Sequence, residues 1–228
     1  MRRFFIEHIP NTSTFSLPEE ESKHIVRVLR CDVGEKLLLL NGKGLKVTAE
    51  IIHPHPKKCE VKVISTVLLE PKSTGFHLAI APTKNLDRME WLVEKIVEIG
   101  ATRISFIQCE RSERVQLKLD RIQRVAISAM KQAQHDFLLQ IDEIQAFSTF
   151  VEQFPNGGIA HCMQGEKKAV SQLNFPQRIL IGPEGDFSEK ELELALKCKY
   201  EPIHLGDSRL RTETAGMVAC VLAINSIA

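Results

Sequence analysis

The chain has 228 residues, of which 43% are hydrophobic, and a formal net charge of +1 at pH 7. This length and hydrophobic content suffice for one substantial core or two smaller ones. No run of about twenty apolar residues is present, which excludes a transmembrane helix, and segment 1–8 lacks the uninterrupted apolar region of a signal peptide. We therefore expect a cytoplasmic protein. The six cysteines form no CxxC pair, and His53 and His55 have no further ligand cluster nearby, so no metal site is predicted.

Residues 1–70 have the pattern of a small β-rich domain. Their apolar runs are rich in leucine and β-branched residues and are separated by a glycine-containing turn and a His-Pro turn. We expect strands at 36–40, 46–52 and 59–68. A short stretch with proline, serine and glycine at 70–75 separates this part from the rest of the chain.

One helix is expected in this domain, from Pro18 to Arg30. Glutamates occupy its first turn, where the helix dipole favours acidic residues. The domain also contains a local concentration of basic side chains that the net charge conceals: Arg2, Arg3, Lys23, Arg27 and Arg30. Such a concentration is typical of RNA binding, although a solvated helix face has the same pattern. His24 is a candidate RNA contact or, alternatively, a core histidine.

Residues 71–228 alternate apolar runs with helical periodicity, which is the pattern of a parallel α/β sheet. Strands are expected at 76–81, 104–109, 158–162, 178–181 and 202–205. Helices are expected at 86–99, at 119–133, after the capping box of Ser188 and Glu191, and at 212–227. The last helix is apolar on almost every side, so we expect it to be buried, in the core alone or also against a second subunit.

Two glycine-containing loops, 181–188 and 204–215, each follow an apolar run and precede a helix. Ligands of open α/β sheets bind beyond the carboxyl ends of the strands, so the two loops could share one pocket. Glu184 and Asp186 place negative charge where a phosphate would lie, and the first loop lacks the GxxxxGK[ST] spacing. A neutral or cationic ligand is therefore favoured, and a tight turn that needs glycine is the alternative without a ligand.

Taken together, the two loops resemble the C-terminal motifs of the RsmE family, the 16S ribosomal RNA uracil-N3 methyltransferases of the SPOUT superfamily. Earlier segments match the family in the same order: 24–30, 83–100, Glu110-Arg111-Ser112 and Lys131-Gln132. Several positions depart from the family pattern, and a proline expected at 137–140 is absent. Asp186 replaces a glycine, Ala133 replaces a serine, and Ser208 replaces an arginine, with Arg209 one place later.

The resemblance implies a SPOUT-type α/β methyltransferase domain with a C-terminal trefoil knot at 71–228, after a PUA-like RNA-binding domain at 1–70. It also implies a homodimer that methylates N3 of a uridine in the decoding region of 16S rRNA, on the small ribosomal subunit, with S-adenosylmethionine as the methyl donor. The departures keep one rival open, a non-catalytic RNA-binding or ribosome-assembly protein of the same fold. A further alternative is a nucleotide-binding enzyme that uses the Gly-Pro-Glu-Gly loop for phosphate.

The resemblance further implies which residues form the site. The cofactor would be held by Ile181, Gly182, Pro183, Glu184, Gly185, Leu205, Gly206, Leu210 and Thr214. Arg211 is the candidate for stabilising the uracil anion or holding its phosphate, and Glu213 and Glu184 are candidates for an acid, base or orienting role. The ordinary alternative is that Glu213 is an acid of a first helical turn and pairs with Arg211. Segment 161–163 is expected to form a third wall of the pocket.

Overall fold

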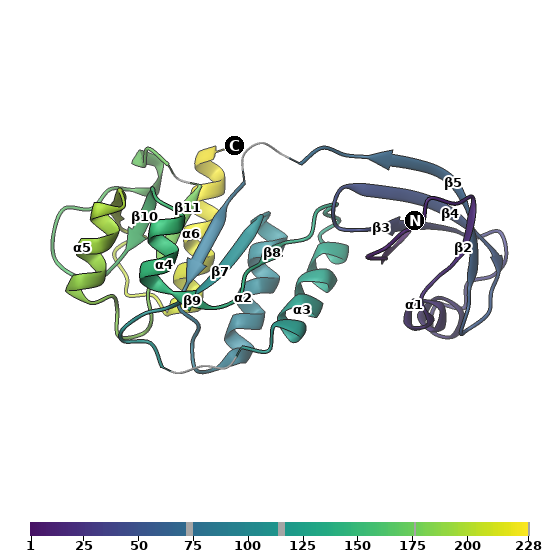
Figure 1. Cartoon of the computed structure of the whole chain (residues 1–228), viewed down its shortest axis with the longest axis horizontal. Coiled ribbons are helices and arrows are strands. Elements are labelled where there is room, and N and C mark those ends of the chain that lie inside the picture. The colour runs from purple at the N-terminus through teal and green to yellow at the C-terminus, as the bar shows by residue number, and fades with distance from the viewer. Residues whose placement is uncertain (72–74, 114–116, 176, 228) are drawn as a thin grey trace. The chain divides into compact units, whose positions relative to one another are not determined.

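The computed structural model describes residues 1–71, 75–113, 117–175 and 177–227 (Figure 1). The chain divides into two compact units, Met1–Lys72 with Met130–Leu138, and Ser73–Ala129 with Leu139–Ala228. Within the described residues, no helix is long and apolar enough to cross a membrane.

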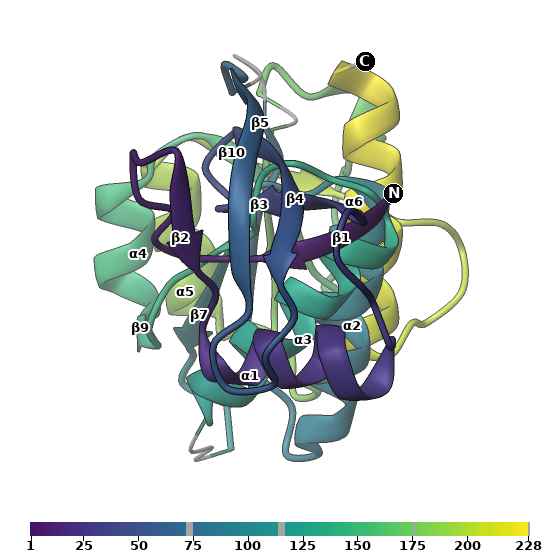
Figure 2. The same ribbon diagram turned by 90° about the vertical axis from the view of Figure 1, so that its right-hand side faces the viewer.

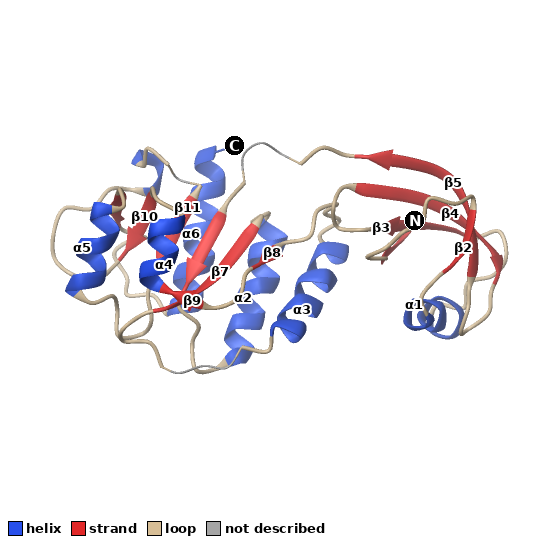
Figure 3. Cartoon of the chain, in the orientation of Figure 1, coloured by secondary structure: helices blue, strands red, loops and turns tan. Residues whose placement is uncertain are grey.

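The first unit contains a sheet in the order β1-β3-β4-β5-β2 (Figure 3). Its strands are β1 (Arg2–Phe5), β2 (Thr14–Ser16), β3 (Lys36–Leu40), β4 (Leu45–His53) and β5 (Glu60–Leu68). β1 is parallel to β3, and the other neighbours are antiparallel. Alternate residues Val47, Ala49 and Ile51 of β4 are buried in the core, as one-sided burial of a strand requires. The three predicted strands are confirmed, whereas β1 and β2 were not predicted.

The predicted helix of this unit is confirmed, but it changes its form partway. α1 (Glu19–Lys23) continues as the π-helical turn η1 (His24–Val28). Ser22 fixes its inner face, because its buried hydroxyl donates to the Leu17 carbonyl at 3.1 Å and accepts from the Cys59 backbone N–H at 3.0 Å. Arg30 follows with a φ of 53°, in the left-handed region, and ends the segment.

The second unit contains a parallel sheet in the order β12-β10-β11-β6-β7-β8, with β9 also paired to β7. Its strands are β6 (His77–Ile80), β7 (Arg103–Gln108), β8 (Gln140–Ile141), β9 (Gln145–Ala146), β10 (Gly157–Ala160), β11 (Arg178–Ile181) and β12 (Tyr200–Ile203). The predicted strands are confirmed with shifts of one or two residues at their ends. Because β10 lies between β11 and β12, the segments that follow these three strands are neighbours at one edge of the sheet.

Helices cover both faces of this sheet. They are α2 (Leu86–Ile99), α4 (Phe147–Gln153), α5 (Glu189–Lys197) and α6 (Thr212–Ile227), with a 3₁₀ turn η2 (Val170–Gln172) beside α6. Helix α3 (Leu119–Gln132) lies between β7 and β8 in the chain, and its last residues belong to the first unit. Figure 2 shows α4 and α5 on one side and α2 and α6 on the other. Gly216 allows α6 to approach the sheet closely, because a Cβ there would lie 3.0 Å from Ile80 Cδ1 and 3.2 Å from Leu92 Cδ1.

For helix α6 the sequence left two alternatives, burial in the core alone or burial also against a second subunit, and this chain buries only part of the helix. Its inner face is buried through Gly216, Ala219 and Ala223. Val221 and Leu222 are each 38% exposed. The expectation of burial in the core alone is therefore wrong for this part of the helix, because the strands and α2 contact only one of its apolar faces.

Candidate functional site

The predicted loops line one cavity of about 1010 Å³ at the carboxyl ends of β10, β11 and β12. Segments 160–163, 181–186 and 203–213 form its sides, with Arg88, Lys167 and Ala215. The segment after β10 thus provides the third wall that the sequence predicted.

Most residues predicted to hold a cofactor are brought together here. Ile181, Gly182, Pro183, Glu184, Gly185, Leu205, Gly206 and Leu210 line the large cavity. Thr214 lies instead on an adjoining hollow of about 640 Å³, which it shares with Trp91, Arg209 and Arg211. Arg211 lines both spaces. Their contact with a cofactor stays a prediction.

The two loops require glycine for different structural reasons. Gly206 has a φ of 116°, and a Cβ there would meet nothing within 4 Å. The space beside its backbone is therefore empty, and residues with a side chain rarely adopt its backbone conformation. At Gly182 a Cβ would lie 3.1 Å from the ring of Phe187. Gly182 thus permits the close packing of Phe187 under the first loop.

The segment resembling E-R-S supports the first loop, a role that the sequence did not reveal. Arg111 Nη1 donates to the carbonyl oxygens of Gly185 and Phe187 at 3.1 and 3.3 Å. Glu191 joins the same segments, since its Oε1 accepts from the Glu110 N–H and its Oε2 from the Ser188 N–H, both at 2.8 Å. Arg111, which follows β7, and Glu191, in the first turn of α5, therefore both hold the first loop in place.

Glu213 pairs with a residue that the sequence did not single out. It is only 7% exposed, and its Oε1 lies 3.6 Å from Arg88 Nε. Its Oε2 is buried without a hydrogen-bond partner among the described residues. In the described residues, no ion pair joins Glu213 to Arg211. The ordinary pairing of these two is therefore replaced by one between α6 and α2, and Arg211 is exposed.

His161 is a further polar side chain of the cavity. Both ring nitrogens are buried and have no hydrogen-bond partner in the described structure. Burial and then the charge of Lys167 lower the pKa of His161, against the opposing effect of Asp186. The ring is therefore neutral near pH 7. Glu184, in contrast, is exposed at the rim of the first loop.

The residues predicted to contact RNA fall into two groups. Lys23, His24, Arg27 and Arg30 are exposed, and His24 Nδ1 lies 3.9 Å from Glu21 Oε2. Arg2 Nη1 donates to the Leu29 carbonyl at 3.2 Å, and Arg3 Nη1 lies 3.3 Å from Asp136 Oδ1. The arginines of β1 are thus engaged within their own unit, whereas the helical residues face solvent.

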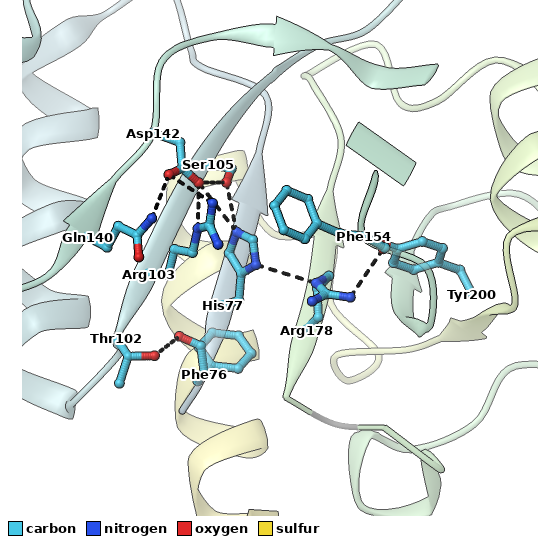
Figure 4. A network of polar contacts seen from close by, with 10 residues as sticks. All are labelled: Phe76, His77, Thr102, Arg103, Ser105, Gln140, Asp142, Phe154, Arg178 and Tyr200. Carbon is cyan, nitrogen blue, oxygen red and sulfur yellow. Dashed lines mark hydrogen bonds and ion pairs between the residues drawn. The ribbon is translucent and has the colours of Figure 1, made fainter. Parts of the chain in front are cut away.

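A second polar cluster lies at the amino ends of the strands (Figure 4). His77 Nε2 lies 2.7 Å from Ser105 Oγ, Ser105 donates to Asp142, and Arg103 donates to Asp142 at 2.7 and 3.1 Å. Arg178 Nε donates to His77 Nδ1 at 3.4 Å. Burial, followed by the charges of Arg178 and Arg103, lowers the pKa of His77 to about 3. Both nitrogens of this neutral ring are partnered, which is typical of a structural histidine.

Metal-binding side chains do not gather anywhere in the described residues, where no group of three or more His, Cys, Asp or Glu could hold a metal ion.

Two sequence models match this chain. A model of the RNA methyltransferase domain family matches residues 70–224, and a model of the RNA methyltransferase PUA domain matches residues 17–64. Among curated proteins, Ribosomal RNA small subunit methyltransferase E of Bacillus subtilis is 27% identical, over 96% of this chain and 94% of the relative.

Solved structures of relatives have the same fold over nearly the whole of this chain. A probable rRNA-methyltransferase from Porphyromonas gingivalis is 38% identical with a TM-score of 0.90, over 99% of this chain and all of that one. A Ribosomal RNA small subunit methyltransferase E from Neisseria gonorrhoeae, bound to S-adenosyl methionine, is 25% identical with a TM-score of 0.86. The match covers 100% of this chain and 98% of that one. A putative methyltransferase from Legionella pneumophila with bound SAM is 26% identical with a TM-score of 0.83, over 98% and 97%.

Proposed function

This chain belongs to the RNA methyltransferase family, as its resemblance to RsmE enzymes predicted, and we propose that it methylates N3 of a uridine in 16S rRNA of the small ribosomal subunit, with S-adenosylmethionine as the methyl donor. The predicted fold class, a parallel-sheet methyltransferase domain with a PUA-like domain before it, is confirmed. The observation that carries the proposal is the single cavity formed by both glycine-containing loops. The trefoil knot stays a prediction.

The cavity suits S-adenosylmethionine better than a nucleoside triphosphate. Four basic side chains and four acidic ones line it, so the cavity has no excess positive charge that would hold a polyphosphate. Glu184 and Asp186 lie in the first loop, where a phosphate would have to bind, and that loop lacks the GxxxxGK[ST] spacing. The open backbone at Gly206 allows close approach of an adenosine. When bound, S-adenosylmethionine supplies the methyl group. The residues of the two loops named above would hold it, and Thr214 would contribute from the adjoining hollow.

The target atom requires an exposed base. N3 lies on the Watson–Crick edge of uracil, so the base must be unpaired or flipped into the site. Its proton must leave, and the negative charge that develops on the ring carbonyls must be stabilised. Arg211 is exposed beside the cavity and has the permanent charge that this task needs. Glu213, with one unpartnered oxygen, and Glu184 are the candidates for accepting or orienting the proton.

RNA would be bound chiefly by the domain at 1–70, and catalysis would belong to the domain at 71–228. The exposed side chains of Lys23, His24, Arg27 and Arg30 support this division. Arg2 and Arg3 would add positive charge near them, although both already donate within their unit. A protein that modifies ribosomal RNA would act in the cytoplasm.

We further propose a homodimer, because α6 exposes Val221 and Leu222. Burial of apolar side chains by a second copy would remove them from water. Light scattering at micromolar concentration should give about twice the chain mass of 25.8 kDa. A particle of monomer mass would contradict this assembly.

Two measurements test the function. Calorimetry should detect binding of S-adenosylmethionine and none of ATP. Incubation with tritiated S-adenosylmethionine and small subunits from cells lacking the enzyme should yield N3-methyluridine after nucleoside analysis. Another methylated nucleoside as the product would overturn the assignment of uridine N3 as the methylated atom. Cofactor binding without any product would favour the non-catalytic RNA-binding or ribosome-assembly protein, and ATP binding would favour a nucleotide-binding enzyme.

A further inference from the structure

Asp186, one of the departures from the family pattern, joins two walls of the cavity. Its Oδ2 accepts from the backbone N–H of Cys162 at 2.7 Å, and its Oδ1 accepts from that of Phe187 at 2.8 Å. The backbone N–H of Asp186 donates to the Pro183 carbonyl at 2.9 Å and closes a turn. The φ of Asp186 is 63°, in the left-handed region. A glycine would adopt this backbone conformation more easily, but it has no side chain with which to reach Cys162.

The segment held by Asp186 lies between the two proposed cofactor loops. These loops follow β11 and β12, and β10 lies between those strands in the sheet. The residue that precedes Cys162 is His161, which lines the same cavity. The hydrogen bond to the Cys162 N–H therefore fixes the backbone next to His161.

His161 is half-buried, and its ring nitrogens lack the partners that buried polar atoms normally have. Its two ring nitrogens are buried, and neither has a hydrogen-bond partner among the described residues. Buried polar atoms are nearly always hydrogen-bonded, and leaving one unpaired costs free energy. A ligand of the cavity would supply the missing partner.

We propose that Asp186 is a positioning residue that holds the end of β10, so that His161 forms a hydrogen bond with the bound S-adenosylmethionine. This inference rests on the proposed function. The lowered pKa of His161 agrees with it, because a neutral imidazole has one donor and one acceptor nitrogen and does not repel the sulfonium charge. Asp186 thus connects the first loop to a cofactor contact that the two loops alone do not provide.

The test uses the full chain and measures the dissociation constant for S-adenosylmethionine by calorimetry. His161→Phe, which keeps an aromatic ring without nitrogens, should raise Kd by about tenfold. Asp186→Gly should raise it similarly, and Asp186→Asn less, because an amide keeps one acceptor oxygen. Glu189→Gln is the control, since it removes an exposed acid at the start of α5 and should leave Kd unchanged.

A double variant tests the link between the two residues. If Asp186 acts through His161, Asp186→Gly should add little to the effect of His161→Phe, whereas independent effects would multiply. In methyl transfer, KM for the cofactor should rise with little change in kcat at saturation, and the urea midpoints should stay close to that of the parent chain. Parent-like Kd in His161→Phe would overturn the inference while leaving the proposed function intact. Independent effects would overturn the positioning role. Failure of the parent chain itself to bind S-adenosylmethionine would overturn the proposed function.

Discussion

Arg88 Nε lies 3.6 Å from Glu213 Oε1, and this ion pair joins α2 to the first turn of α6 beside the cavity. The Glu213 carboxylate is buried, whereas the Arg88 side chain is 38% exposed. Removal of Arg88 would leave a buried carboxylate without its counter-charge, which is more costly than loss of the pair as a whole.

We therefore expect Arg88→Ala to lower the free energy of unfolding by about 1–3 kcal/mol. Adding Glu213→Gln should restore part of that loss, because a neutral amide is less costly to bury. Urea denaturation of the two single variants and the double variant measures the coupling. Additive losses would show that Arg88 and Glu213 do not stabilise each other.

Arg211 should matter for methyl transfer and little for cofactor binding. Its exposed guanidinium lies where the large cavity and the adjoining hollow meet. Arg211→Ala should leave Kd for S-adenosylmethionine within a few-fold and lower kcat by about 10²-fold or more, because charge that stabilises a developing anion is lost. Arg209→Ala, which removes a neighbouring exposed arginine, is the comparison. Equal losses in both variants would argue against a special role for Arg211.

The exposed basic residues of the first helical segment should determine how RNA binding depends on salt. Changing Lys23, Arg27 and Arg30 together to alanine should weaken binding to 16S rRNA and reduce the slope of log K against log salt by about 2–3. Cofactor affinity should not change. The matched control changes Lys36, Lys57 and Lys62, which are exposed elsewhere in the same unit. If the control variant loses as much affinity for 16S rRNA as the first variant, net charge would explain the loss and the position of the basic residues would not.

Local patterns predicted the longer elements, and the reasons are visible in the structure. The capping box of Ser188 and Glu191 starts α5, and apolar spacing defines α2. Strands β1 and β2 were missed because they are short and lie at the sheet edges, where pairing with β3 and β5 defines them. Helix α4 was missed because its seven residues have neither a side-chain cap nor an acidic first turn, the feature that marks the start of α1.

The cavity was predictable from the sequence, and the contacts that hold it were not. The two loops contain glycine patterns that can be recognised in isolation. Arg111 and the Gly185 carbonyl that it contacts are 74 positions apart in the chain. The pairing of Asp186 with Cys162, or of Glu213 with Arg88, likewise depends on strand order and helix packing. No local pattern encodes such long-range partners.

Gly206 should be required for cofactor binding. Gly206→Val would place a branched side chain in the open space beside the loop and oppose a φ of 116°. We expect no measurable binding of S-adenosylmethionine by calorimetry. Gly100→Val is a close control, because Gly100 has a φ of 106° and equally open surroundings but ends α2. If both variants bind the cofactor as the parent chain does, the second loop does not contact it.

His77 should make the protein less stable as the pH falls below about 6.5, the ordinary pKa of histidine. Its pKa is lowered to about 3 in the folded chain, so between these values the unfolded chain binds a proton that the folded chain does not. Stability therefore rises with pH in this window, and this group alone should make the protein about 2 kcal/mol less stable at pH 5 than at pH 7. His77→Gln should flatten this dependence in urea denaturation, even though the variant is less stable at pH 7. His53→Gln, at an exposed histidine, should keep the slope of the parent chain. An unchanged slope in His77→Gln would mean that His77 is not held neutral in the folded protein.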